Sequence, residues 1–142
     1  MVRLYFAYGS NMWCEQMKKR CPSHRKIGTG VLRQYRWIIS ARGYANIVKS
    51  ESDYVEGVIY KITESDERRL DRYEGVQSGV YIKEVIPIEI DGESRECLVY
   101  IDPDNDEGKP KHEYIGRINK AISRSELSPE YVSRYLRKFI PA

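Results

Sequence analysis

The chain has 142 residues, enough for one domain, residues 1–142, with a hydrophobic core of its own. Hydrophobic residues make up 41% of it and charged residues 32%, which is typical of a globular protein. The formal net charge is only +3, from 24 basic and 21 acidic side chains that are interleaved along the chain, so the charge indicates neither a nucleic-acid partner nor an acidic tail.

Cysteine usage and hydropathy indicate the cellular compartment that we expect for this protein. Cys14, Cys21 and Cys97 are odd in number and form no C-x-x-C pair, so we expect no disulfide framework and a reducing, cytoplasmic compartment. No basic-then-apolar signal segment is visible, and no apolar run approaches the ~18 residues that a membrane helix needs. We therefore expect no membrane association, and either a monomer or a homodimer.

The first 62 residues are predicted to form strands and one short helix. Leu4–Ala7 is apolar and predicts a strand. A helical pattern follows from Met12 to about Arg20, with Ser10 or Asn11 as a suitable N-cap and the basic run 18–20 in the last turn. The next expected elements are a loop at 21–30, strands at 31–40 and 44–48, a turn at 50–53 and a strand at 54–62.

The hydrophobic period changes at residue 63, where a second helix is predicted. Thr63 followed three residues later by Asp66 resembles a capping box, which marks a helix start. Leu70 and Tyr73 lie on one face of this helix. Gly75 is a natural stop, because glycine readily adopts the left-handed conformation that ends many helices.

A hairpin and two helices are predicted to complete the chain. Asp91-Gly92 is a strong signal for a two-residue hairpin turn. The last two helices are expected to present Ile115, Ile118 and Ile122 on one face and to begin at Ser128-Pro129, respectively. The element order β-α-β-β-β-α-β-β-α-α is not a βαβ repeat, so we expect an α+β fold whose mostly antiparallel, barrel-like sheet is flanked by helices.

The segment Tyr8-Gly9-Ser10-Asn11, between the first strand and the first helix, is one candidate site. Gly9 permits a tight turn and lets a ligand approach the main chain. The backbone amides that follow lie at the predicted helix N-terminus, where unpaired N–H groups and the helix dipole favour negative charge. These amides would hold a carboxylate or a developing oxyanion. The alternative is an ordinary strand-to-helix turn with a serine cap.

The segment Tyr73-Glu74-Gly75, at the predicted end of the second helix, is the other candidate site. A carboxylate there faces the negative end of the helix dipole, and this dipole together with burial would raise the pKa of Glu74. A raised carboxylate pKa suits a general base that works near neutral pH. The alternative is an exposed glutamate in a fraying turn, with Arg72 or Lys83 compensating its charge.

Metal ligands are not indicated by the sequence. Asp102, Asp104 and Asp106 alternate as in a calcium loop, but the glycine comes one place late and a predicted strand, not a helix, precedes them. His24 and His112 have no partner at i, i+4 and no nearby cysteine pair. We expect no metal and no cofactor.

Two blocks of the sequence, "YFAYGSN" at 5–11 and "LDRYEGVQSGVY" at 70–81, resemble the gamma-glutamylcyclotransferase family. The element order is similar over nearly the whole chain, including "SPEYVSRYL" near its end. The resemblance implies the family's small mixed barrel flanked by helices. By the same resemblance, Glu74 would be the catalytic acid/base, and the residues lining the substrate cavity would be Tyr8, Gly9, Ser10, Asn11 and Tyr81.

The resemblance also implies a reaction that forms 5-oxoproline. The free α-amine of a gamma-glutamyl group attacks its own γ-carbonyl, and the amine attached there leaves, without metal, cofactor or protein nucleophile. The stretch "GYANIVKSESDYVEG" departs from the family pattern, with Tyr44 and Asn46 where small residues are common. The leaving group therefore stays open: an amino acid, the Cys-Gly of glutathione, a polyamine or an antibiotic amine. The alternative function is a non-catalytic module that binds a carboxylate metabolite in the same cavity.

Overall fold

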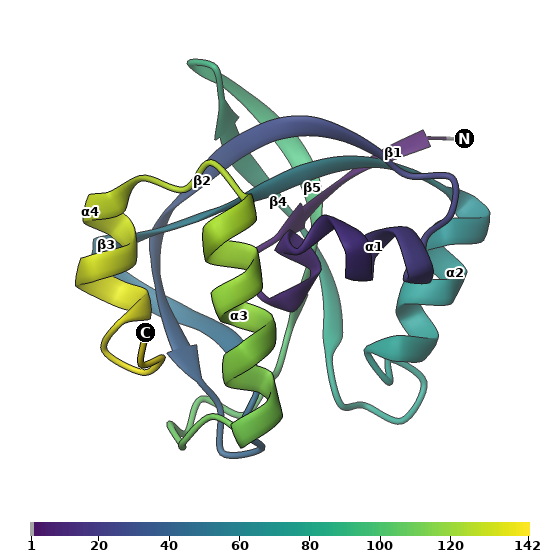
Figure 1. Cartoon of the computed structure of the whole chain (residues 1–142). Coiled ribbons are helices and arrows are strands. Elements are labelled where there is room, and N and C mark those ends of the chain that lie inside the picture. Colours follow the sequence, from purple (N-terminus) through teal and green to yellow (C-terminus); the bar gives the residue numbers. More distant parts are fainter. Residues whose placement is uncertain (1) are drawn as a thin grey trace.

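Five strands close into a barrel in the computed structural model, which describes residues 2–142 (Figure 1). The strands are β1 (Val2–Ala7), β2 (Arg25–Ile39), β3 (Ala45–Thr63), β4 (Ile82–Ile90) and β5 (Glu93–Ile101). They follow the order β1-β3-β2-β4-β5 around the barrel, and every pair is antiparallel except β1 with β5, which is parallel. The predicted α+β fold with a mixed, mostly antiparallel barrel is confirmed.

The helices lie outside the barrel. They are the 3-10 turn η1 (Ser10–Met12), α1 (Cys14–Arg20), α2 (Glu64–Tyr73), α3 (His112–Arg124) and α4 (Pro129–Tyr131), which continues as the π-helical turn η2 (Val132–Leu136). Figure 1 shows α1 and α2 toward one side of the barrel, α4 toward the other and α3 between them. Because η1 packs against both α1 and α3, the segment that follows β1 is enclosed by helices.

Strands β2 and β3 are longer than the sequence indicated. The predicted loop at 21–30 is wrong from Arg25 onward, because these residues pair with the last part of β3. The predicted turn at 50–53 is also wrong. These residues bulge out of β3 opposite Gln34, whose φ of 67° lies in the left-handed region, and pairing resumes on both sides. Residues that favour turns also suit a bulge, so the local signal was ambiguous.

Local signals from Thr63 onward are confirmed. Thr63 Oγ1 accepts a hydrogen bond from Asp66 N (3.1 Å), and the Asp66 carboxylate accepts one from Thr63 N (3.3 Å), which completes the capping box. Asp91-Gly92 forms the turn between β4 and β5 with φ values of 51° and 80°. Ser128 caps α4 by accepting a hydrogen bond from Tyr131 N (3.2 Å). Each signal involves residues at most three positions apart.

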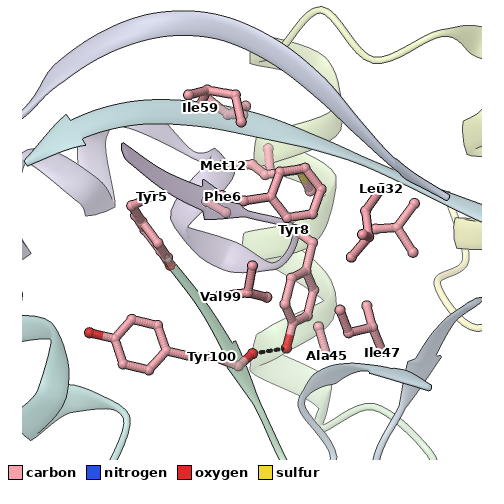
Figure 2. Packing of buried hydrophobic residues seen from close by; sticks show 14 of the residues in the cluster. Tyr5, Phe6, Tyr8, Met12, Leu32, Ala45, Ile47, Ile59, Val99 and Tyr100 are labelled. Atoms are coloured by element: carbon pink, nitrogen blue, oxygen red, sulfur yellow. Dashed lines mark hydrogen bonds between the residues drawn. The ribbon is translucent and has the colours of Figure 1, made fainter. Parts of the chain in front are cut away.

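The core lies inside the barrel and continues to the edge of the candidate site. Figure 2 shows the ring of Tyr8 beside Phe6, extending toward Ala45 and Ile47. The Tyr8 hydroxyl donates a hydrogen bond to the backbone carbonyl of Tyr100 (2.6 Å), drawn as a dashed line in Figure 2. Tyr8 is therefore anchored in the core, and the three residues after it leave the barrel from a fixed point.

Candidate active site

A cavity of about 370 Å³ opens where the end of β1, the end of α2, the β2–β3 connection and α3 meet. This volume is in the range of small-molecule binding sites. The lining residues come from six parts of the chain: Tyr5, Phe6 and Tyr8–Asn11; Arg20; Arg42, Tyr44 and Ala45; Arg72–Gly75, Val80 and Tyr81; Tyr100; Tyr114 and Arg117. All the residues that the sequence assigned to a site, from both candidate segments, therefore border one pocket.

The side chains of the segment after β1 make different hydrogen bonds from those that the sequence predicted. Neither Ser10 nor Asn11 caps α1, whose N-cap is Trp13 and makes no side-chain hydrogen bond, so that prediction is wrong. The reason is the 3-10 turn η1, which contains Ser10 and Asn11, so that α1 begins only at Cys14. The side chains of Ser10 and Asn11 instead accept hydrogen bonds from Gln16 Nε2, at 2.7 Å to Ser10 Oγ and 2.8 Å to Asn11 Oδ1.

Gly9 is required because other groups approach its backbone closely. A Cβ at this position would lie 2.9 Å from the Tyr114 hydroxyl and 3.1 Å from the Ala45 side chain. The same hydroxyl accepts hydrogen bonds from Ser10 N and from Ala45 N, both at 3.3 Å. The amides of Gly9 and Asn11, on either side of Ser10, have no acceptor within residues 2–142.

The end of α2 follows the sequence-based prediction closely. Gly75 has a φ of 63°, Val76 N donates to Asp71 O (3.0 Å), and Gly75 N donates to Arg72 O (3.2 Å). This pair of bonds is a Schellman motif, which ends a helix and fixes the direction of the chain beyond it. Glu74 is the last residue before the left-handed glycine, and its side chain borders the pocket.

The Glu74 carboxylate is crowded by protein without being paired. Burial disfavours its charged form and raises its pKa to about 7, while the nearby Arg20 guanidinium acts in the opposite direction. Within residues 2–142 no side chain forms a hydrogen bond or an ion pair with this carboxylate. A carboxyl group with a pKa of about 7 takes up and releases a proton near neutral pH.

Buried phenols surround the Glu74 carboxylate. Burial raises the pKa of Tyr5, Tyr8, Tyr81 and Tyr114, and the charge of Glu74 adds to this effect in each case, so these tyrosines stay protonated near neutral pH. The Tyr81 hydroxyl donates a hydrogen bond to the carbonyl of Ala45 (2.9 Å). The phenols thus form a fixed wall in which Glu74 is the group able to titrate near pH 7.

The sequence did not predict several of the residues that line the pocket. Arg20 was interpreted as part of a basic helix end, yet it lines the pocket and donates a hydrogen bond to Asn11 Oδ1 (3.2 Å). Arg42 lies on the connection between β2 and β3, and Tyr114 and Arg117 lie on α3, more than 100 residues after β1. No short-range pattern marks these side chains, because the barrel brings them together only on folding.

Groupings typical of metal sites and of membrane-spanning helices are absent from residues 2–142. The described part of the chain contains no group of three or more His, Cys, Asp or Glu side chains placed to hold a metal ion. In the aspartate-rich loop, Asp102 Oδ1 accepts a hydrogen bond from Asp104 N (2.9 Å), and Asp104 Oδ1 accepts one from Asp106 N (3.0 Å). Among residues 2–142, no helix is long and apolar enough to cross a membrane.

Comparisons with known proteins agree on one family. The family model described as "Gamma-glutamyl cyclotransferase, AIG2-like" matches residues 5–117. Gamma-glutamylcyclotransferases from Homo sapiens and Mus musculus are 30% and 32% identical over 141 residues, covering 90% of this chain and 74% of each relative. A solved structure named "Gamma-glutamyl cyclotransferase" superposes with a TM-score of 0.89 at 27% identity, covering 100% of this chain and 90% of the other. The chain therefore belongs to the gamma-glutamyl cyclotransferase, AIG2-like family.

Proposed function

We propose that this protein is an enzyme that cyclises a gamma-glutamyl amine or dipeptide to 5-oxoproline, with Glu74 as the general acid/base. The observation that carries the proposal is the unpaired Glu74 carboxylate, whose burial raises its pKa to about 7, in a pocket shared with the segment Tyr8–Asn11. A pocket that only binds a carboxylate metabolite gains nothing from an unpaired, partly buried carboxylate, whereas a proton shuttle near pH 7 requires one.

The reaction is an intramolecular aminolysis. The α-amine nitrogen forms a bond to the γ-carbonyl carbon, and the amine proton passes to Glu74. The tetrahedral intermediate then breaks the bond between that carbonyl carbon and the leaving nitrogen, to which Glu74 returns the proton. No water is consumed, and the products are 5-oxoproline and the free amine.

The pocket contributes mainly by holding the substrate folded. Nucleophile and electrophile belong to one molecule, and well-oriented intramolecular reactions reach effective molarities of about 10⁵ M or more. The unpaired amides of Gly9 and Asn11 are available to hold the α-carboxylate or the oxyanion that develops on the γ-carbonyl. The aromatic wall that includes Tyr8 and Tyr81 restricts the extended conformers of the substrate.

A substrate panel tests this function. Purified protein is incubated with gamma-glutamyl amino acids, gamma-glutamyl dipeptides and gamma-glutamyl amines, and 5-oxoproline is measured by chromatography. We expect at least one class to be converted, with equal amounts of 5-oxoproline and free amine. Tight binding of several compounds without any 5-oxoproline would contradict the proposal and favour a binding module that holds a carboxylate metabolite.

A further inference from the structure

The pocket carries more positive charge than one gamma-glutamyl group would use. Among the described residues that line it, Glu74 is the one carboxylate, and the four basic residues are Arg20, Arg42, Arg72 and Arg117. A gamma-glutamyl group brings a single α-carboxylate. An excess of guanidinium groups favours a ligand with a further negative charge, which the leaving amine would have to carry.

Two of these arginines are engaged by the protein itself. Arg117 binds both carboxylate oxygens of Glu113, through Nε at 2.9 Å and through Nη2. Arg20 donates to Asn11 Oδ1 (3.2 Å), and its guanidinium lies 4.6 Å from the ring centre of Tyr73. The charge of Arg117 is therefore neutralised, and Arg20 is fixed beside the segment that precedes α1.

The side chains of Arg42 and Arg72 are both exposed, but the two residues are held differently. Arg72 lies on the last turn of α2, where it also borders a separate shallow hollow. Arg42 lies on a tight connection: Gly43, with a φ of 92°, donates to Ser40 O (2.9 Å) and accepts from Lys111 N (3.1 Å). The amide of Arg42 donates to Ser40 Oγ (3.2 Å). The backbone of Arg42 is thus fixed at the border of the pocket.

A buried carboxylate lies behind Arg42. The side chain of Asp102 is 1% exposed, and its Oδ2 atom is 3.9 Å from Arg42 Nε. Within residues 2–142 this Oδ2 has no hydrogen-bond partner, whereas Oδ1 accepts from Asp104 N (2.9 Å). A buried carboxylate oxygen without a hydrogen bond is costly unless a cation compensates it. Asp102 therefore attracts the Nε side of the guanidinium, and both Nη nitrogens have no acceptor among residues 2–142.

Tyr81 lies on the Arg42 side of the pocket, because its hydroxyl donates a hydrogen bond to the carbonyl of Ala45 (2.9 Å), three residues after Arg42. Arg20 instead lies beside Asn11 and the ring of Tyr73, the residue that precedes Glu74. The charges of Glu74, Asp102 and Arg42 all act on the pKa of Tyr81, in agreement with this arrangement. In the proposed reaction the attacking amine and the α-carboxylate share one carbon, so both stay near Glu74 and Arg20 and the leaving group extends toward Tyr81 and Arg42.

We propose that Arg42, oriented by the buried Asp102, is the specificity residue for the leaving amine. Its free Nη nitrogens bind a carboxylate on that amine, so the enzyme favours gamma-glutamyl amino acids and peptides over neutral or cationic gamma-glutamyl amines. The inference rests on the proposed function, because it concerns the part of the substrate that leaves. Asp102 acts through Arg42 and is a positioning residue.

Two substrates that differ by one carboxylate test the proposal. Gamma-glutamyl-alanine and gamma-glutamyl-ethylamine have the same leaving nitrogen and carbon chain, but only the first carries a carboxylate. For the native protein we expect kcat/KM to favour gamma-glutamyl-alanine by roughly 10- to 100-fold, the weight of a hydrogen bond to a charged group. In Arg42→Gln this ratio should approach one, with the loss falling on gamma-glutamyl-alanine. Arg33→Gln, an exposed arginine paired with Glu89 outside the pocket, is the matched control and should keep the ratio.

The outcomes separate this inference from the proposed function. A ratio near one in the native protein, or a ratio that Arg42→Gln leaves intact and Arg72→Gln abolishes, would overturn the assignment to Arg42. If no compound of the wider panel yields 5-oxoproline, the proposed function fails, and calorimetric titration with these two compounds decides the inference. Tighter binding of gamma-glutamyl-alanine that Arg42→Gln abolishes would support it, and equal binding of both compounds would overturn it.

Discussion

Two carboxylates lie near Tyr81, and the protein surrounds them in opposite ways. Glu74 is partly buried with no side-chain partner, and burial raises its pKa to about 7. Asp102 is more deeply buried, but it has an amide donor from Asp104 and the guanidinium of Arg42 beside it. A carboxylate that is buried without partners is suited to exchanging a proton, and one that is buried with partners is suited to holding a neighbour in place.

Replacing Glu74 by glutamine should have the largest effect. Glu74→Gln keeps the size of the side chain and removes its basicity, so turnover should fall by about 10²- to 10⁴-fold, the usual weight of a general acid/base. Binding of a gamma-glutamyl compound, measured by calorimetry, should persist, because the amides of Gly9 and Asn11 are untouched. Glu64→Gln, an exposed glutamate at the other end of α2, is the control and should keep full activity. Normal turnover by Glu74→Gln would show that another group moves the proton.

The same variant should reveal the raised pKa in its stability. Because the pKa of Glu74 rises on folding from its ordinary value of 4.5 to about 7, the protonated group favours the folded state. This contribution is complete below about pH 4.5 and is lost as the pH rises through about 7. Relative to Glu74→Gln, the native protein should therefore lose up to about 3 kcal/mol of unfolding free energy between pH 4 and pH 8. Urea unfolding at several pH values measures this difference. A native protein that gains stability over that range would mean that Glu74 has a cationic partner.

Replacing Asp102 by asparagine should change binding and leave the proton transfer alone. Asp102→Asn keeps an acceptor for Asp104 N but removes the charge that attracts Arg42. We expect KM for gamma-glutamyl-alanine to rise by up to about tenfold, while kcat stays within about twofold and the pH dependence of the rate is unchanged. A fall in kcat as large as that of Glu74→Gln would place Asp102 in the chemistry and remove the distinction between the two carboxylates.

The end of α2 and the start of α1 differ in how well the sequence predicted them. The end of α2 depends on six consecutive residues, from Asp71 to Val76, so its stop and the place of Glu74 could be predicted. At the start of α1, the turn η1 places Ser10 and Asn11 before the helix, and their side chains bind Gln16. A capping pattern shows neither that such a turn will precede the helix nor that a third side chain will bind the expected capping residues.

Arg42 and Asp102 illustrate what the sequence alone does not reveal. The two residues are 60 positions apart, and both are held by closures of the chain that depend on the barrel. Asn46 Oδ1 accepts a hydrogen bond from Asp102 N (2.9 Å), and Lys111 N donates one to Gly43 O (3.1 Å), so two loops hold each other. The barrel-like α+β fold follows from local hydrophobic patterns and element order, whereas the charge pattern of the pocket follows from contacts between distant loops.

The smallest expected effect concerns Arg20, the positive charge that acts on Glu74. The titratable neighbours of Glu74 are this guanidinium and the phenols of Tyr5, Tyr8, Tyr81 and Tyr114. Since the phenols stay protonated near neutral pH, Arg20 is the group that stabilises the charged form of the carboxylate. Removing this guanidinium should raise the pKa of Glu74 further. The pH at which kcat/KM increases, on the acidic limb of its pH profile, should then be higher.

We expect Arg20→Met to shift the acidic limb of the kcat/KM profile upward by a fraction of a pH unit, which lowers the rate near pH 6.5 by about two- to fivefold. Arg20→Lys keeps the charge and should restore the native midpoint even if the hydrogen bond to Asn11 Oδ1 is lost. The amine of the substrate titrates equally in all three proteins, so it does not produce the difference. A uniform loss of rate at every pH would mean that Arg20 only positions the segment around Asn11, and a downward shift would contradict its effect on the Glu74 pKa.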